Sequence, residues 1–221
     1  MIKTVIFDMD GLMFDTERLS NQAWRLAGEK MGITIQQEML DSMKGVNRVE
    51  CDKILRFWLG ENTDLKYLRS LKDGYMEQDL KDHGVPVKRG LRELLSYLKT
   101  HGYKTVLATS ASEDRAQGML KMADVEKYFD HLIFGNMIEK SKPEPDIFLE
   151  AARKAYTKPE DCLVLEDSPN GITAAHAAGC HTIMVPDMTP ASEEQKELAD
   201  DVVDSLEDVL EMLKAVDLSA E

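Results

Sequence analysis

The sequence has few cysteines, and the three that it has are odd in number and far apart. Cys51, Cys162 and Cys180 show neither the even count of a disulfide framework nor the close spacing of a zinc site. Reduced thiols are typical of the cytoplasm, so we expect a cytoplasmic protein. The five histidines show no metal-ligand spacing either, and we expect them to be surface or packing residues.

The chain also lacks a basic tract and a long apolar run. Its 41 aspartates and glutamates exceed its 27 lysines and arginines, which gives a formal net charge of −14. Such a surface repels nucleic acid and anionic membranes, and we expect the acidic segment 192–201 to be solvated. No apolar stretch approaches the ~20 residues that cross a bilayer, and the first strand begins too early to leave room for a signal peptide. We therefore expect no nucleic-acid partner and no membrane association.

Residues 17–84 lack any convincing strand pattern. Apolar residues recur there at helical spacing, which predicts helices over residues 18–31, 33–43, 49–59 and 62–83. A run of helices between the first two strands is typical of an inserted domain. We predict that residues 17–84 form an all-helical cap domain over the end of the first strand.

From residue 85 onward, strand and helix patterns alternate. The predicted strands are 104–108, 131–134, 162–165 and 181–185, and the predicted helices are 89–101, 113–123, 145–156, 169–178 and 206–216. Alternation with short connections favours an α/β fold with a doubly wound, Rossmann-like parallel sheet. Residues 1–16 and 85–221 would form this core domain, and a ligand would bind at the carboxyl ends of its strands.

The first predicted strand ends in two carboxylates. Asp8 and Asp10 follow the apolar run Val5-Ile6-Phe7, and Gly11 behind them allows a sharp turn. Because side chains alternate along an extended chain, Asp8 and Asp10 can project together. Two carboxylates held close repel each other unless a cation lies between them or one is protonated, and Mg²⁺ is the natural cation for oxygen ligands. A polar turn without a ligand is the alternative interpretation.

Further polar residues follow other predicted strands or lie in a proline-rich loop entering a helix: Thr109, Ser110, Lys142, Glu166 and Asp167. Each alone could be a helix cap or a solvated charge, but together they predict one site at the carboxyl edge of the sheet. Carboxylates there could hold a cation with positions open to an anionic substrate. Hydroxyls, backbone N–H groups and an ammonium suit phosphoryl oxygens, and a carboxylate beside a metal can act as a nucleophile.

The four motifs resemble those of the haloacid dehalogenase superfamily, in the branch with a helical cap inserted after the first motif. They are Asp8-Met9-Asp10-Gly11, Thr109, Lys142 and Glu166-Asp167, in the family's order and spacing. The resemblance implies that Asp8 is the nucleophile and Asp10 the general acid and base. It also implies that Mg²⁺ is bound by Asp8, the backbone carbonyl of Asp10 and Asp167, with help from Glu166. Thr109 and Lys142 would hold the transferring phosphoryl group.

Within the superfamily, the chain resembles the β-phosphoglucomutases and the sugar-phosphate phosphatases around them. Residues 44–48 are similar to the specificity loop of the mutases, so Lys44 and Arg48 are expected to contact substrate, with solvated surface charges as the alternative. Ser20 stands where the mutases carry a histidine that couples sugar binding to proton transfer, which disfavours a mutase.

The predicted function is therefore a Mg²⁺-dependent phosphatase. It would hydrolyse a small phosphorylated metabolite, most simply a sugar phosphate, through an aspartyl-phosphate intermediate. A β-phosphoglucomutase-type mutase is the alternative, and a phosphonate hydrolase or a non-catalytic binding module is less favoured. We expect a monomer, because a moving cap works well on a single chain. The particular substrate and its pathway are not predicted.

Overall fold

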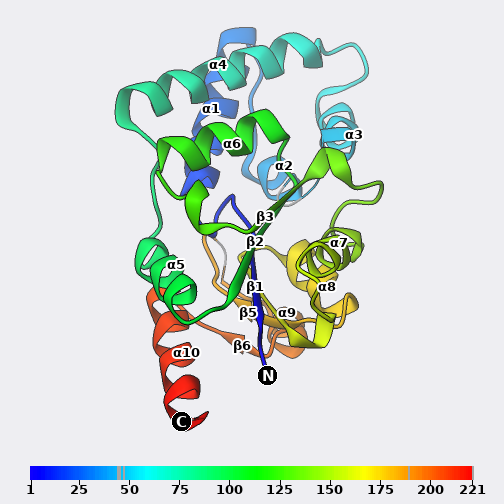
Figure 1. Cartoon of the computed structure of the whole chain (residues 1–221). Coiled ribbons are helices and arrows are strands. Elements are labelled where there is room, and N and C mark those ends of the chain that lie inside the picture. The colour runs from blue at the N-terminus through cyan, green and yellow to red at the C-terminus, as the bar shows by residue number, and fades with distance from the viewer. Residues whose placement is uncertain (44–45, 47, 189, 221) are drawn as a thin grey trace.

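A single parallel sheet organises the chain in the computed structural model, which describes residues 1–43, 46, 48–188 and 190–220. In this part of the chain the strands follow the order β3-β2-β1-β4-β5-β6, and each neighbouring pair is parallel. Their bounds are β1 Thr4–Phe7, β2 Lys104–Thr109, β3 His131–Phe134, β4 Cys162–Glu166, β5 His181–Met184 and β6 Asp201–Val202. The order runs outward from β1 toward both edges (Figure 1), so the predicted doubly wound α/β fold is confirmed.

Helices cover both faces of the sheet and one of its ends (Figure 1). The α-helices are α1 Thr16–Met31, α2 Gln37–Ser42, α3 Arg48–Leu59, α4 Leu65–His83, α5 Leu91–Thr100, α6 Glu113–Met122, α7 Asp146–Lys154, α8 Pro169–Ala177, α9 Glu193–Leu198 and α10 Leu206–Ala220. Short 3₁₀ turns are η1 Glu126–Tyr128, η2 Gly135–Met137 and η3 Pro159–Asp161. None of the described helices combines the length and the apolarity that crossing a membrane requires.

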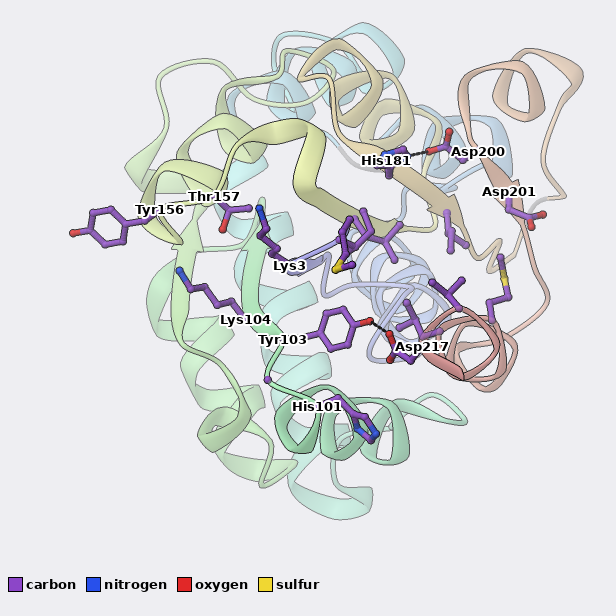
Figure 2. Close-up of a pocket in the computed structure, with 18 residues that line it drawn as sticks. Lys3, His101, Tyr103, Lys104, Tyr156, Thr157, His181, Asp200, Asp201 and Asp217 are labelled. Carbon is purple, nitrogen blue, oxygen red and sulfur yellow. Dashed lines mark hydrogen bonds and ion pairs between the residues drawn. The ribbon is translucent and has the colours of Figure 1, made fainter. Parts of the chain in front are cut away.

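The amino ends of the strands open onto a cavity of about 920 Å³ (Figure 2). Its lining includes Ile2 and Lys3, which precede β1, and Lys104, the first residue of β2. Residues of α10, Met212 among them, complete the lining. This cavity therefore lies at the end of the sheet opposite to the predicted site.

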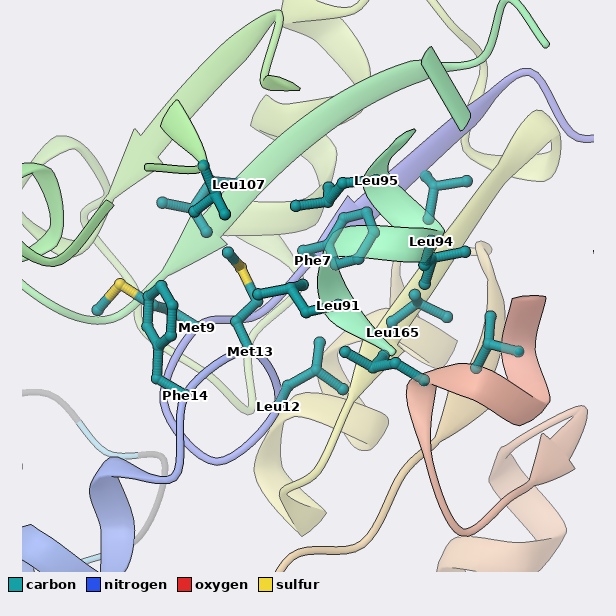
Figure 3. Close-up of a cluster of buried hydrophobic side chains, with 14 of the residues drawn as sticks. Phe7, Met9, Leu12, Met13, Phe14, Leu91, Leu94, Leu95, Leu107 and Leu165 are labelled. Atoms are coloured by element: carbon teal, nitrogen blue, oxygen red, sulfur yellow. The ribbon is translucent and has the colours of Figure 1, made fainter. Parts of the chain in front are cut away.

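The strands divide their side chains between two buried layers. Val5 and Phe7 of β1 belong to the layer that α5, α6 and α10 cover, whereas Ile6 belongs to the layer under α7 and α8. This is the alternation expected of a strand buried on both faces. Figure 3 shows the first layer, in which Phe7 lies among leucines of α5 such as Leu94. The apolar run that begins the chain is thus the centre of the fold.

Helices α1–α4 lie at the carboxyl end of the sheet and have a hydrophobic cluster of their own (Figure 1). Trp24 of α1 and Leu68 of α4 are buried in it, and α1 packs along α4. The side chain of Asp64 caps α4 by accepting a hydrogen bond of 3.0 Å from the backbone N–H of Tyr67. The described residues between 16 and 83 contain no strand, as the sequence predicts.

Some element boundaries differ from the predicted ones. Helix α2 begins at Gln37 rather than near residue 33, because the β-branched residues at 33–35 disfavour a helix. Residues 192–201 are mostly exposed, as expected, but they contain α9, which begins with a capping box between Ser192 and Gln195. Strand β6 was not predicted, and its two residues are too few for an apolar alternation to reveal it.

One carboxylate adds to the apolar packing of helix α10 against the core. Asp217 accepts hydrogen bonds of 2.7 Å from the hydroxyls of Tyr97 and Tyr103, the second of which is drawn in Figure 2. The bonds from Tyr103 and then Tyr97 lower the pKa of Asp217. Its stabilising contribution is therefore present above the pKa of an unfolded aspartate, about 3.9, and is lost as the pH falls through the lower folded value.

We predict that Asp217→Asn lowers the free energy of unfolding at pH 7 by about 0.5–1 kcal/mol, which is below the usual range for hydrogen bonds to a charged group because solvent screens this half-exposed group. Urea denaturation at a series of pH values measures this difference, which should shrink below about pH 4. Glu211→Gln, on an exposed part of the same helix, is the control. A difference that stays constant with pH would contradict the assignment.

Candidate active site

The predicted motif residues meet because three strands end side by side. Phe7, the last residue of β1, pairs with Leu107 of β2 and with Leu165 of β4. Asp8 follows directly on β1, and its backbone N–H donates to the Leu165 carbonyl at 3.1 Å. Parallel strands end at the same edge of a sheet, so the register places Asp8 beside the residues that follow β2 and β4.

A cavity of about 330 Å³ lies between this edge and helices α1, α3 and α4. It is lined by every predicted site residue that the structure describes: Asp8, Asp10, Arg48, Thr109, Ser110, Lys142, Glu166 and Asp167. Lys44, the remaining one, lies outside the described residues. Strand ends and helices thus contribute to one enclosed space, although the motifs are far apart in the sequence.

The ammonium group of Lys142 joins two carboxylates at the floor of the cavity. Its Nζ lies 2.5 Å from Oδ1 of Asp8 and 2.7 Å from Oε1 of Glu166, and the lysine is only 3% exposed. Burial alone would lower the pKa of Lys142, but the charges of Asp8 and Glu166 raise it overall. The other Glu166 oxygen accepts from the backbone N–H of Ser168 at 2.6 Å. Lys142 is therefore a charged group fixed in place.

Three carboxylates gather around this lysine. Asp8, Glu166 and Asp167 each offer an oxygen, and these oxygens lie within 4.8 Å of one another. Burial, and then the charge of Glu166, raise the pKa of Asp8 to about 7 against the opposing effect of Lys142. Burial, Glu166 and Asp8 raise the pKa of Asp167 well above its usual range. One ammonium does not balance three carboxylates, and a set of oxygen donors fits a hard divalent cation such as Mg²⁺.

The side chain of Asp10 forms hydrogen bonds with different residues from those that contact Asp8. Its two oxygens accept hydrogen bonds of 2.7 and 2.5 Å from the guanidinium of Arg115, and Oδ1 also accepts one of 2.5 Å from the hydroxyl of Thr16. Burial acts to raise the pKa of Asp10, but Arg115 and Thr16 lower it overall. Among the described residues, the side chain of Asp10 does not belong to the acidic group around Lys142. A cation between the side chains of Asp8 and Asp10, which the sequence offers as one of two ways to accommodate this pair, stays a prediction.

Thr109 and Ser110 lie at the carboxyl end of β2: Thr109 is the last residue of the strand and Ser110 follows it. Thr109 is buried, and its hydroxyl accepts from the backbone N–H of Ala111 at 3.1 Å. The backbone of Ser110 packs against Gly135, where an added Cβ would lie 2.3 Å from the Ser110 carbonyl oxygen. This packing fixes the loop between β2 and α6 along the cavity. The binding of a phosphoryl group by Thr109, Ser110 and Lys142 remains a prediction.

Sequence reasoning did not identify several charged residues of the cavity wall: Arg69, Lys72 and Arg115. Arg69 and Lys72 lie 5.5 and 5.8 Å from the ring centre of Trp24, and Arg69 binds Asp52 at 2.6 Å. Ser20 of α1 also lines the cavity. Charges on helices are ordinarily solvated, and the fold alone reveals which of them face inward.

Among the residues that the structure describes, those lining the larger cavity at the amino ends of the strands form no comparable cluster of carboxylates. Its charged groups pair locally: Tyr103 with Asp217 and His181 with Asp200 (Figure 2). The Nζ of Lys104 donates to the carbonyl of Ala155 at 2.5 Å. The smaller cavity is therefore the candidate active site, although the other has more volume.

Two glycines leave room for the carboxylates. At Gly11, where φ is +88°, an added Cβ would lie 2.2 Å from Oδ2 of Asp167. At Gly171, in the first turn of α8, it would lie 1.7 Å from Oε1 of Glu166. Only glycine fits these positions without displacing a carboxylate. The sequence shows Gly11 as a turn residue but gives no sign that Asp167 occupies the space beside it.

We predict that Gly171→Ala lowers the free energy of unfolding by about 1–3 kcal/mol, because the methyl group must displace the buried carboxylate of Glu166. Gly74→Ala, in the exposed middle of α4 with nothing within 4 Å, is the control and should stabilise the protein by about 0.5–1 kcal/mol. Chemical denaturation measures both. Equal stability of the Gly171 variant and the wild type would contradict the packing described here.

Comparison with known proteins agrees with this geometry. The family model described as haloacid dehalogenase-like hydrolase matches residues 5–185. The chain is 34% identical to a phosphorylated carbohydrates phosphatase of Thermotoga maritima over 82% of this chain and 84% of that protein. It is 30% identical to a β-phosphoglucomutase of Bacillus subtilis over 83% of each. Its structure is similar to that of a β-phosphoglucomutase of Clostridium difficile, with a TM-score of 0.81 at 27% identity over 97% and 96% of the chains.

Proposed function

Because the chain belongs to the haloacid dehalogenase-like hydrolase family, we propose that it is a Mg²⁺-dependent phosphatase acting through an aspartyl-phosphate on Asp8. Its substrate would be a small phosphorylated metabolite, most simply a sugar phosphate. The observation that carries the proposal is the buried Asp8 carboxylate, bound to Lys142 at the floor of a cavity that also contains Asp10. The resemblance drawn from four motifs, and with it the prediction of an enzyme of this superfamily, are confirmed by the comparisons.

In the proposed mechanism, Asp8 and Asp10 divide the work. An oxygen of Asp8 attacks the phosphorus and forms an acyl phosphate, while Asp10 gives a proton to the departing oxygen of the metabolite. Asp10 then takes a proton from water, which attacks the acyl phosphate and releases inorganic phosphate and free Asp8. Lys142, Thr109 and Ser110 would hold the phosphoryl oxygens during both steps.

The acidic group on the cavity floor would hold Mg²⁺. Asp8, Glu166 and Asp167 are its side-chain ligands in this proposal, together with the backbone carbonyl of Asp10. The ion, when bound, offsets negative charge on the transferring phosphoryl group. The fit rests on three clustered carboxylates facing a single ammonium.

We further propose that residues 17–84 form a cap domain on a core of residues 1–16 and 85–221. The separate hydrophobic cluster of α1–α4 supports this division. Asp15 and Pro86 meet through a backbone hydrogen bond of 2.8 Å, so both connections between the two parts run side by side. Such a cap would exclude water and select the substrate, with Lys44 and Arg48 as candidate contacts.

All three cysteines are free thiols, which supports a cytoplasmic location.

We predict that the wild-type chain releases phosphate from members of a sugar-phosphate panel when Mg²⁺ is present, and that EDTA abolishes this release. Asp8→Asn should reduce kcat by at least ~1,000-fold, because the amide cannot act as the nucleophile. A phosphate-release assay measures both. Asp161→Asn, which removes an exposed carboxylate bound to Lys3, is the control. Turnover that survives both EDTA and Asp8→Asn would refute the proposal.

A sugar-phosphate mutase is the second candidate, because the β-phosphoglucomutase of B. subtilis matches most of the chain. In that case the aspartyl-phosphate would return its phosphoryl group to a sugar hydroxyl rather than to water. Ser20 lines the cavity where the mutases carry a histidine, and this favours the phosphatase.

Product analysis separates the two candidates. The reaction contains β-glucose 1-phosphate, Mg²⁺ and a trace of glucose 1,6-bisphosphate. We expect free phosphate from this sugar or from another member of the panel. Glucose 6-phosphate without free phosphate would instead establish a mutase.

A further inference from the structure

Arg115 is the one residue that binds both oxygens of Asp10 in the described part of the chain. It lies in the first turn of α6, six positions after Thr109, the last residue of β2, so a short loop connects the two residues. The two bonds, 2.7 Å from Nη1 to Oδ2 and 2.5 Å from Nη2 to Oδ1, form a parallel fork. A bidentate guanidinium fixes the plane of a carboxylate as well as its place.

The hydrogen bonds leave a single site on Asp10. A carboxylate has about four lone-pair sites, two on each oxygen. Oδ1 accepts from Arg115 and from Thr16, which fills both of its sites, whereas Oδ2 accepts among the described residues from Arg115 alone. One site on Oδ2 is therefore occupied by no donor among the described residues. Asp10 is 22% exposed in its side chain, which leaves it accessible from the cavity.

The surroundings of Arg115 hold it at this place. Beyond Asp10, the charges acting on the guanidinium are those of Glu17 in α1 and Asp73 in α4. Lys72 of α4 is close enough for the charge of Arg115 to lower its pKa, after the larger effect of burial. Arg115 thus lies near carboxylates from both parts of the chain: Asp10 at the sheet edge, and Glu17 and Asp73 on helices α1 and α4.

We propose that Arg115 is a positioning residue which, together with Thr16, reserves one site on Oδ2 of Asp10 for the transferring proton. At this site, Oδ2 would give a proton to the departing oxygen and would later accept a proton from water. The inference rests on the proposed function, because it assigns a geometry to the acid and base of that reaction. It adds a residue that none of the four motifs contains.

The experiment compares two substrates that differ in their need for this proton. An alkyl phosphate that the wild type hydrolyses needs protonation of its leaving oxygen, whereas 4-nitrophenyl phosphate releases a stable anion without it. Arg115→Met should lower kcat on the alkyl phosphate by about 10–100-fold and on 4-nitrophenyl phosphate by less than about 3-fold. Arg115→Lys keeps the charge but cannot form the fork, so it should show a smaller loss of the same kind.

Two controls isolate the role of the contact. Arg153→Met removes an equivalent fork to Glu150 on an exposed helix and should change neither rate. In the background of Asp10→Asn, Arg115→Met should add less than about 3-fold to the loss, because the two residues act as one unit. Arg115→Lys also serves if the methionine variant does not fold.

Three outcomes would overturn the inference: equal losses on both substrates, no loss on either, or a full additional loss in the Asp10→Asn background. A wild type that hydrolyses neither substrate, nor any member of the sugar-phosphate panel, would instead reject the proposed function. The two failures are therefore distinguishable. A substrate-dependent loss in Arg115→Met that vanishes with Asp10→Asn supports the assignment of Arg115.

Discussion

The buried ammonium of Lys142 is the interaction on which the rest of the site depends. It joins Asp8, which follows β1, to Glu166, the last residue of β4, and both carboxylates are almost fully buried. Removing one partner of such a group leaves an uncompensated charge in the interior, which is strongly destabilising. The pairing of β1 with β4 brings the two carboxylates together. The charge balance of the site therefore depends on the register of the sheet.

Two aspartates separated by one residue acquire opposite properties from their neighbours. Burial and Glu166 raise the pKa of Asp8 to about 7, whereas Arg115 and Thr16 lower the pKa of Asp10 against the effect of burial. The two carboxylates therefore have different electrostatic surroundings, although a single residue separates them in the sequence. These surroundings are built from different parts of the chain, because Lys142 lies in a loop before α7 and Arg115 in the first turn of α6.

The sequence was sufficient for strands β1–β5 and for the polar residues at their carboxyl ends, because buried parallel strands are short apolar runs and polar residues at their ends stand out. Thr109 and Glu166 were found in this way. Arg115 was not, since a charged residue in a helix looks the same whether it is solvated or faces a cavity. The space that Gly171 leaves for Glu166 is equally invisible, because it depends on the approach of α8 to the end of β4.

The division between the core and the helical region explains why the nucleophile, the acid and the base are easier to predict than the choice between a phosphatase and a mutase. A phosphatase and a mutase can share the same nucleophile and the same acid and base, and they differ in whether water or a sugar hydroxyl reaches the aspartyl-phosphate. That choice depends on what the helices place opposite Asp8. In this chain they contribute Ser20, Lys72 and Arg69 to the cavity wall. In the proposed function, specificity would therefore reside on the helical side of the cavity, where sequence patterns are least informative, whereas the four motifs lie on the opposite side.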